Sequence, residues 1–290
     1  MNVNSMDNST RAEVLVQALP HLKKYYGKTI VVKYGGNAMV SDALKEQVME
    51  DVVLLSMVGI KVVLVHGGGP EMSDLMKRLG KQPQFIDGLR VTDAETVAIA
   101  EMVLAGRINK SLVNLLQMKG GSAVGLSGID GRLIQAEMKD EKLGYVGKIT
   151  NIHPEPIQSL LAGGYIPVIS TLGCDDSGNI YNINGDTAAG RIAAAVGAER
   201  LIMMTDIEGI LLDRHDPDTL LSELTVEAAE AMIQDGSISG GMIPKVRCCI
   251  DSLAEGVKAA VIIDGRVPHA ILMEILTNEG AGTMFRKDNA

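Results

Sequence analysis

The sequence predicts an α/β fold, a three-layer αβα sandwich with a mainly parallel central sheet. Short runs of β-branched and aliphatic residues recur along the chain without polar alternation, which is typical of strands buried on both faces. Stretches with helical periodicity separate most of these runs, and such alternation places parallel strands in one sheet between two layers of helices. The predicted strands include residues 30–32, 62–65, 166–169, 201–204 and 261–263.

Three of the intervening stretches carry clear helix signals. Residues 41–58 have apolar side chains at spacings of three and four, and Gly59 follows as a C-terminal cap. Thr92 and Glu95 form a capping box that opens a second helix. A third helix is predicted for residues 242–253, directly after a pair of glycines. These signals supply the helical layers of the sandwich.

Two hairpins and one β-rich region interrupt the alternation. Residues 84–92 contain Asp87-Gly88, and residues 172–182 contain a cluster of Asp, Ser, Gly and Asn, so both are predicted to turn between two short strands. Residues 121–151 are also expected to be rich in β-structure. The fold should therefore carry a smaller β-region beside the main sheet.

The chain divides into an N-terminal extension, residues 1–27, and one domain, residues 28–290. Within residues 11–26 an apolar stripe predicts an amphipathic helix, broken near Pro20, whose stripe must pack on its own domain or on another subunit. No linker marks a boundary in the domain itself. We expect two lobes, about 28–190 and 191–290, with the functional site in the cleft between them.

Charge and cysteine content restrict the class of protein. The net charge of −9 argues against nucleic acid or an anionic membrane as the partner. The cysteines Cys174, Cys248 and Cys249 form neither a disulfide framework nor a zinc motif, which suits a reducing compartment. The N-terminus lacks the apolar core of a signal peptide, and no apolar run is long enough to span a bilayer. We therefore expect a cytoplasmic protein.

Two glycine-rich turns follow predicted strands. They are residues 33–37 (KYGGN) and 65–70 (VHGGGP), and each stands where a strand ends and a helix begins. Exposed backbone N–H groups and the helix dipole favour an anion at such a place, and glycine lets the anion approach. Neither turn matches a Walker P-loop or a dinucleotide fingerprint. Two such turns after successive strands favour an anion site over turns that are merely tight.

Two lysines stand at positions where a positive charge is unfavourable without a negatively charged partner. Lys33 ends an apolar strand, where a buried charge would be rare without a partner, although a lysine that extends to water is the alternative. Lys245 lies near the start of a helix, where it opposes the helix dipole. A bound anion explains the placement of Lys245 better than helix stability does.

Four further polar residues have less specific patterns. Arg90 follows a hairpin turn, and its spacing alone favours a solvated side chain. Asn182, Asn184 and Asp186 alternate, so they would share one face in an extended chain. Asp186 also suits the first turn of the following helix as a partner of its dipole. The five histidines are scattered without Ser or Cys partners, which gives no support to nucleophilic hydrolysis.

Taken together, six motifs resemble the amino acid kinase family, and most of all its branch that acts on N-acetylglutamate. The resemblance covers the chain from about residue 28 to its end. The motifs occur in the family's order at residues 33–38 (KYGGNA), 66–70 (HGGGP), 88–93 (GLRVTD), 182–186 (NINGD), 205–210 (TDIEGI) and 241–245 (GMIPK).

The resemblance implies that ATP phosphorylates the side-chain carboxylate of N-acetyl-L-glutamate, giving N-acetyl-L-glutamyl 5-phosphate in arginine biosynthesis. Lys33 and Lys245 would stabilise the transferring phosphoryl group, and Asp186 would hold both lysines. The N-lobe would bind the acyl amino acid through Gly68, Gly69, Arg90 and Asn182. The C-lobe would bind ATP, with contributions from Gly35, Gly36, Asp206 and Gly209. Mg²⁺ would be held mainly by the nucleotide phosphates, with no metal-ligand set in the protein.

The resemblance also implies regulation. Arginine-sensitive members have such an N-terminal helix and form homohexamers, and residues 269–283 resemble their arginine-binding region, with Glu274 and Gly280 in the pocket. Many of these members have a histidine directly before the segment that matches residues 262–265, and this chain has Val261 at that position. Two alternatives remain open: a sibling kinase that acts on an aminoadipate derivative, and a non-catalytic arginine-sensing domain. The presence of both Lys33 and Lys245 disfavours the second alternative.

Overall fold

The computed structural model describes residues 7–39, 41–213 and 216–287. Its main sheet contains eight strands in these residues. They are β1 (Thr29–Tyr34), β2 (Lys61–His66), β5 (Ala123–Ser127), β8 (Ile166–Ser170), β11 (Arg200–Thr205), β12 (Glu223–Thr225), β13 (Ala259–Asp264) and β14 (Gly282–Arg286).

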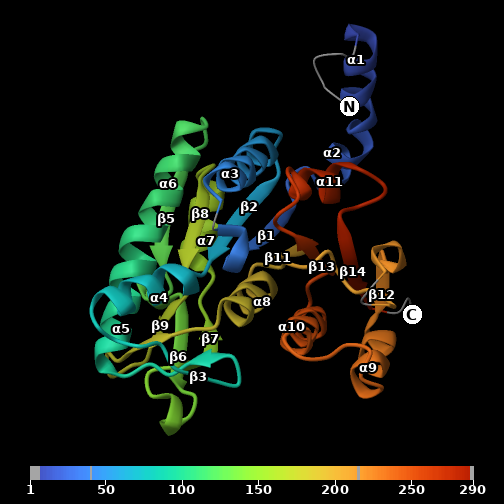
Figure 1. Ribbon diagram of the computed structural model, residues 1–290. Coiled ribbons are helices and arrows are strands. Elements are labelled where there is room, and N and C mark those ends of the chain that lie inside the picture. The colour runs from blue at the N-terminus through green and yellow to red at the C-terminus, as the bar shows by residue number, and fades with distance from the viewer. Residues whose placement is uncertain (1–6, 40, 214–215, 288–290) are drawn as a thin grey trace.

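The sheet runs in the order β12-β14-β13-β11-β1-β2-β8-β5 (Figure 1). Strand β14 is antiparallel to β13, and every other neighbouring pair is parallel. Strands β1 and β11 are adjacent at the centre, so the carboxyl ends of β1, β2 and β11 meet at one edge. Ligands of open α/β sheets bind at this edge. The predicted parallel sheet is confirmed.

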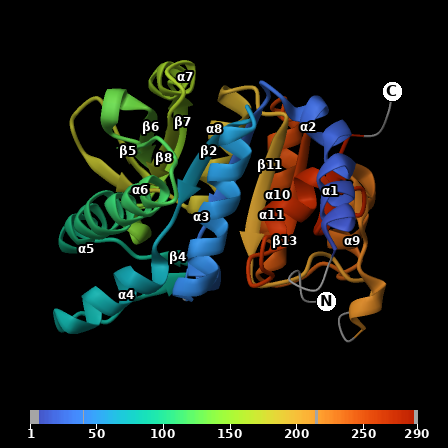
Figure 2. The ribbon, with the colours of Figure 1, turned by 90° about the horizontal axis from the view of Figure 1, so that it is seen from above.

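Helices cover both faces of the sheet (Figure 2). Ile30 and Val32 of β1 pack into one apolar cluster, whereas Val31 packs into a second cluster on the opposite face. The first cluster includes residues of α3 (Asp42–Met57), α4 (Gly69–Arg78), α5 (Ala94–Ala100), the π-helix η3 (Glu101–Ile108), α6 (Asn109–Met118) and α11 (Ala270–Leu276). The second includes residues of α7 (Glu155–Ala162), α8 (Gly185–Ala195), α9 (Val226–Gln234) and α10 (Met242–Ala254). The three-layer αβα prediction is confirmed.

Local signals explain where helices begin. The Ser41 hydroxyl caps α3 by accepting the Leu44 N–H at 3.3 Å. The predicted capping box at Thr92 is wrong in detail. Asp93 caps α5 by accepting the Thr96 N–H at 2.8 Å, while the buried Thr92 hydroxyl donates to the Arg90 carbonyl. Both Thr and Asp are common N-cap residues, so the sequence permits either Thr92 or Asp93 as the cap of α5. The buried position of Thr92 decides in favour of Asp93.

A smaller β-region lies at one end of the molecule, below the main sheet in Figure 1. It confirms both predicted hairpins and the β-rich region. A four-stranded sheet has the order β10-β9-β6-β7, and a separate hairpin pairs two short strands. Their bounds are β3 (Phe85–Ile86), β4 (Leu89–Arg90), β6 (Ile134–Met138), β7 (Gly147–Ile152), β9 (Leu172–Cys174) and β10 (Ile180–Asn182). Short 3₁₀ helices are η2 (Gly36–Met39), η4 (Asp130–Arg132), η5 (Glu141–Leu143) and η6 (Pro217–Thr219).

The N-terminal segment forms two helices, α1 (Asn8–Gln17) and α2 (Leu19–Tyr25). The break falls at Ala18, so that Pro20 lies in the first turn of α2, where its missing N–H does no harm. Helix α1 projects from the rest of the molecule (Figure 1) and buries no residue. Leu15 and Leu19 are 75% and 62% exposed, so the chain itself does not cover the predicted apolar stripe.

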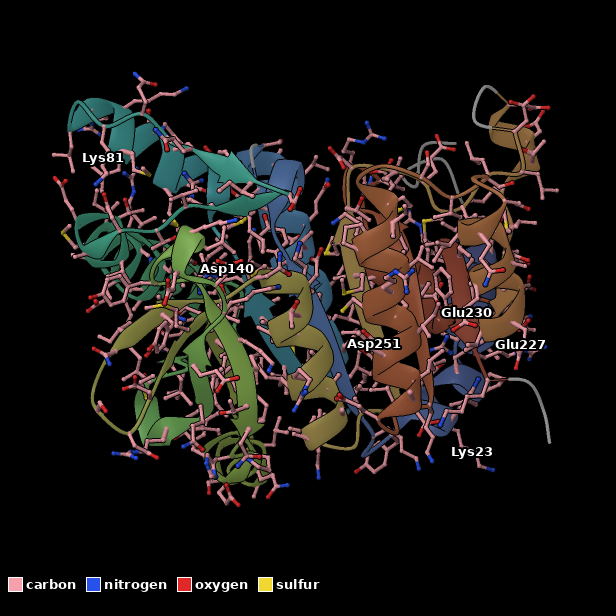
Figure 3. The ribbon with its side chains drawn as sticks, turned by 90° about the horizontal axis from the view of Figure 1, so that it is seen from below. Lys23, Lys81, Asp140, Glu227, Glu230 and Asp251 are labelled. Carbon is pink, nitrogen blue, oxygen red and sulfur yellow. The ribbon has the colours of Figure 1, made fainter. Side chains whose placement is uncertain are left out.

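The two halves of the molecule meet along α8 and α10. Figure 3 shows these helices side by side, with Asp251 on α10. Lys81 and Asp140 lie in the half formed by earlier residues, and Glu227 and Glu230 lie on α9 in the other half. Among the described residues, no helix is both long and apolar enough to cross a membrane.

Candidate active site

An ion cluster forms where the two halves meet. Asp186 lies in the first turn of α8, because Asn184 caps this helix and accepts the N–H groups of Asp186 and Thr187. One carboxylate oxygen, Oδ1, lies 2.9 Å from Nζ of Lys33, which comes from β1. The other oxygen, Oδ2, lies 3.0 Å from Nζ of Lys245, in the first turn of α10. A single carboxylate therefore fixes two ammonium groups side by side.

The electrostatics of the cluster keep Asp186 ionised. Burial by itself would raise the pKa of its carboxyl group, but the charges of Lys33 and Lys245 outweigh burial and lower this pKa to about 2. Lys33 is only 8% exposed, so the alternative of a lysine that extends to water is wrong. Within the chain, Lys245 pairs with the Asp186 side chain at the start of its helix.

Glycines leave room for the Lys33 side chain. A Cβ atom on Gly35 would lie 3.3 Å from its Nζ, which is a tight contact, whereas one on Gly185 would lie at an ordinary contact distance of 3.5 Å from its Cε. The following residue, Gly36, has a φ of +67°, which disfavours other residue types. The first glycine-rich turn thus lies against the ammonium group of Lys33.

A cavity of about 160 Å³ lies beside the second glycine-rich turn. Four residues that the sequence assigned to substrate binding line it together: Gly68, Gly69, Arg90 and Asn182. Gly185, next to Asp186 in the chain, also lines it, so the ion cluster borders this cavity. Asn182 ends β10 whereas Asp186 lies in the first turn of α8, so these residues do not share one face of an extended chain, and the predicted helical position of Asp186 is confirmed.

Arg90 is buried, with 7% of its surface exposed, so the solvated interpretation is wrong. Its Nη2 donates to the Ser73 hydroxyl at 2.8 Å and to the Gly69 carbonyl at 3.0 Å. Its guanidinium carbon lies 4.7 Å from the centre of the Phe85 ring. The sequence analysis did not select Ser73 or Phe85. Ser73 is four residues after Gly69 on α4, a helical spacing that points to the same face.

A second cavity, of about 420 Å³, lies on the other side of the cluster. Asp206, Gly209, Gly241 and Lys245 contribute to its lining, so two separate chain segments predicted for the site come together. Gly35 and Gly36 are not among the described residues that line this cavity. Lys245 both lines it and pairs with Asp186, so two fixed cations stand between two cavities. Such an arrangement can stabilise negative charge that passes from one bound molecule to another.

A third cavity, of about 360 Å³, is lined by none of the three cluster residues and contains Glu274 and Gly280. Glu274 Oε1 lies 3.3 Å from Nη1 of Arg200, and Tyr25 of α2 accepts a hydrogen bond from the same guanidinium. Glu274 Oε2 accepts the Ala281 N–H at 3.1 Å. Helix α2 therefore contributes to this cavity.

Among the described residues, no group of three or more His, Cys, Asp or Glu side chains is placed to hold a metal ion. The three cysteines are free thiols. Burial raises the pKa of the Cys248 thiol to about 12, so this side chain near the cluster is a poor nucleophile.

Comparison with known proteins identifies the architecture. The model of the amino acid kinase family matches residues 28–264, most of the chain. The chain belongs to the amino acid kinase family. An acetylglutamate kinase from Thermosynechococcus vestitus is 54% identical over 286 residues, which covers 98% of this chain and 97% of the relative.

Solved structures of proteins with other activities share the fold of this chain. An N-acetylglutamate synthase from Neisseria gonorrhoeae superposes with TM-scores of 0.84 in its complex with coenzyme A and N-acetyl-glutamate and 0.80 in its complex with coenzyme A and L-arginine, at 24% and 22% identity. Both comparisons cover 96% of this chain but only 64% and 65% of the synthase chain. A carbamate kinase from Giardia lamblia bound to AMP-PNP gives a TM-score of 0.65 at 20% identity, covering 90% of this chain and 99% of its own.

Proposed function

We propose that this protein is an acetylglutamate kinase, which transfers the terminal phosphoryl group of ATP to the side-chain carboxylate of N-acetyl-L-glutamate in arginine biosynthesis. The observation that carries this proposal is the Lys33–Asp186–Lys245 cluster between two cavities, in a chain 54% identical to an acetylglutamate kinase. The product is N-acetyl-L-glutamyl 5-phosphate.

The cluster suits the electrostatic problem of this reaction. A substrate carboxylate with a pKa near ~4.3 is already ionised at neutral pH, so it needs no general base. The barrier comes from bringing this anion towards the polyanionic nucleotide. Lys33 and Lys245 neutralise charge on the transferring group, and Asp186 holds the two ammonium groups at fixed positions. Because the pKa of Asp186 is about 2, it stays an acceptor for both lysines throughout the neutral range.

We assign the acyl amino acid to the smaller cavity, in the N-lobe of about residues 28–190. Arg90 is held by Ser73 and Gly69, which orients its guanidinium before substrate arrives and favours a fork onto the substrate α-carboxylate. Asn182 and the N–H groups of Gly68 and Gly69 supply further donors in the same cavity.

We assign ATP to the larger cavity, in the C-lobe of about residues 191–290, where Asp206 and Gly209 lie. Gly35 and Gly36 would approach the phosphates from the other half, beside Lys33. Mg²⁺ would be held mainly by the nucleotide phosphates, which agrees with oxygen donors and water as its preferred ligands. When bound, it would neutralise phosphate charge together with the two lysines.

An acyl-phosphate assay tests the proposal. Purified protein, ATP and Mg²⁺ are incubated with hydroxylamine, which traps acyl phosphates as hydroxamates, in parallel with N-acetylglutamate, glutamate and N-acetylaminoadipate. We expect hydroxamate chiefly with N-acetylglutamate. A preference for N-acetylaminoadipate would establish the sibling kinase instead. ATP turnover with none of the three would reject an acyl amino acid as the substrate.

We further propose that arginine binds the cavity around Glu274 and Gly280 and inhibits the enzyme. The buried Glu274 carboxylate already accepts one guanidinium, that of Arg200, so the cavity has the chemistry for a second. The Neisseria synthase of the same fold has been solved with L-arginine. Inhibition requires that arginine bind one arrangement of the molecule better than another.

We also propose a cytoplasmic homohexamer in which α1 packs on a neighbouring subunit. Helix α1 buries no residue in the single chain, and its exposed Leu15 supports a partner surface. Deleting residues 1–26, followed by light scattering and arginine titration, tests both proposals. We expect a smaller assembly with a weakened response to arginine and retained kinase activity. A full-length protein that is dimeric and ignores millimolar arginine would reject them and leave the kinase assignment standing.

A further inference from the structure

A buried polar network lies beneath the second glycine-rich turn, outside the roles assigned so far. His66, the last residue of β2, is fully buried. Its Nδ1 lies 2.9 Å from the Gly67 carbonyl oxygen, and its Nε2 lies 3.2 Å from Nδ2 of Asn109. Asn109, also fully buried, begins α6 directly after the π-helix η3. A buried polar pair of this kind requires partners for each of its atoms.

The neighbours of Asn109 fix the orientation of its amide. Its Nδ2 faces two backbone carbonyls, of Val168 at 2.9 Å and of Leu126 at 3.1 Å, and a carbonyl can only accept. Its Oδ1 accepts from Nζ of Lys110 at 3.1 Å. The amide group is therefore held with its nitrogen towards His66, and its two hydrogens are shared among the two carbonyl oxygens and Nε2.

This orientation determines the protonation of His66. Because the Gly67 carbonyl can only accept, the ring hydrogen must be on Nδ1, and Nε2 faces the Asn109 NH2 group as the unprotonated nitrogen. A second proton on Nε2 would point at the Asn109 N–H group. Burial also lowers the pKa of His66 to about 4, which agrees with a neutral ring.

The hydrogen bond to Gly67 fixes the direction of a peptide group. In a trans peptide the C=O and the following N–H point in opposite directions, and no described peptide bond is cis. With the Gly67 carbonyl held towards His66, the Gly68 N–H points away from the ring. Gly67 and Gly68 both line the smaller cavity. On the other side, a Cβ atom on Gly68 would lie 2.2 Å from Cδ1 of Ile108 of η3, so this turn has little room to shift.

We propose that the neutral, Nδ1-protonated His66, held by Asn109, is a positioning residue that aims the Gly68 N–H into the acyl amino acid cavity. His66 does not touch substrate and transfers no proton. The π-helix η3 contributes by placing Asn109 under the turn, as π-helical segments often do at functional sites. The kinetic test of this inference rests on the proposed function, whereas the protonation state of the ring can be tested without it.

Two substitutions at His66 separate its two hydrogen bonds. An Asn amide lies near the position of Nδ1 and retains a donor to Gly67, whereas a Gln amide lies near Nε2 and retains only the bond to Asn109. We expect His66→Gln to raise the KM for N-acetylglutamate at least about 10-fold above that of His66→Asn, with the KM for ATP within about two-fold in both. The exposed pair Asn151–His153, also separated by 3.2 Å, supplies the control. His153→Asn and His153→Gln should leave both KM values unchanged.

The ring is also observed directly. In magic-angle-spinning ¹⁵N NMR of histidine-labelled wild-type protein, His66 is the signal lost in His66→Asn, and we expect a neutral ring protonated on Nδ1 at pH 7. An Nε2-protonated or charged ring would overturn the proposal even if the variants fail to fold. Equal KM values in the two variants, with ATP binding intact by calorimetry, would overturn the positioning role. A wild-type enzyme inactive on N-acetylglutamate would reject the proposed function and leave the NMR result standing.

Discussion

The carboxylates of Asp186 and Glu274 are both largely buried, yet their environments shift their pKa values in opposite directions. For both groups burial raises the pKa of the carboxyl. In Asp186 two lysines, at 2.9 and 3.0 Å, outweigh burial and lower the pKa to about 2. In Glu274 one arginine at 3.3 Å does not outweigh burial, and the pKa is raised. The balance between burial and close cations thus decides the sign of each pKa shift.

This difference suits the two proposed roles. A carboxylate that must hold two catalytic cations has to stay charged, whatever arrives nearby. Because burial raises the pKa of Glu274, its charged form is less favoured than that of Asp186. An additional guanidinium in its cavity would stabilise the charged carboxylate and would itself be bound more tightly for that reason. Five substitutions test and sharpen the comparison, from the largest expected effect to the smallest.

The largest effect is expected for the two lysines of the cluster. Lys33→Ala and Lys245→Ala should each lower kcat by ~10²–10³-fold or more, because each removes a charge that stabilises the transition state. Each variant also leaves Asp186 with one cation, as Glu274 has. Steady-state kinetics measure the loss, and circular dichroism checks the fold. Near-normal turnover in either variant would show that its lysine has no role in catalysis.

Removing Arg200, which pairs with Glu274, should affect stability rather than turnover. Arg200→Leu leaves a buried carboxylate without its charge partner, which typically costs roughly 3 kcal/mol. The loss should be larger at pH 8 than at pH 5, because without Arg200 the pKa of Glu274 rises further and the carboxyl escapes charge burial when protonated. Denaturant unfolding at both pH values measures this. An equal loss at both would mean that lost packing, not charge, destabilises the variant.

Arg90→Lys should mainly weaken binding of the acyl amino acid. An ammonium cannot reproduce the fork of a guanidinium held by Ser73 and Gly69, so we expect the Kd for N-acetylglutamate to rise about 10-fold. ATP affinity should change little. Separate calorimetric titrations of the two ligands measure both values. A large loss of ATP affinity with normal N-acetylglutamate binding would reverse the assignment of the cavities.

The smallest effect concerns a third buried carboxylate, Asp51 of α3, whose neighbour is the half-exposed His269 at 2.6 Å. Burial raises the pKa of Asp51 from 3.8 to about 6. Since the folded state binds this proton more tightly, stability is full below pH ~4 and falls as pH rises through 6. The shift corresponds to roughly 3 kcal/mol at most, and a weaker bond to His269 in Asp51→Asn would offset part of it.

We therefore expect Asp51→Asn to stabilise the protein by about 1 kcal/mol at pH 7.5, with the gain vanishing near pH 4. Thermal or urea unfolding across this range measures the difference. A loss of stability at pH 7.5 would show that the charged contact with His269 outweighs burial, and Asp51 would then belong with Asp186 rather than with Glu274.

Much of the fold was determined by local sequence. The apolar runs predicted strands β1, β2, β8, β11 and β13, and Asp87-Gly88 predicted its hairpin, because both residues adopt the positive φ that such a turn requires. The glycine-rich turns were also predicted from local sequence, since glycines directly after a strand indicate a tight turn. The roles of Lys33, Lys245 and Asp186 were implied by family resemblance and not by spacing.

Only the tertiary structure decided which polar groups meet. Asp186 and Lys245 are 59 residues apart, His66 and Asn109 are 43 apart, and Arg200 and Glu274 are 74 apart. Spacing alone favoured a solvated Arg90, and it left both an anion partner and an extension to water open for Lys33. Both side chains are buried because sheet order and helix packing surround them. Sequence patterns report on neighbours along a strand or helix, whereas a charge acquires its partner only when the topology brings distant segments together.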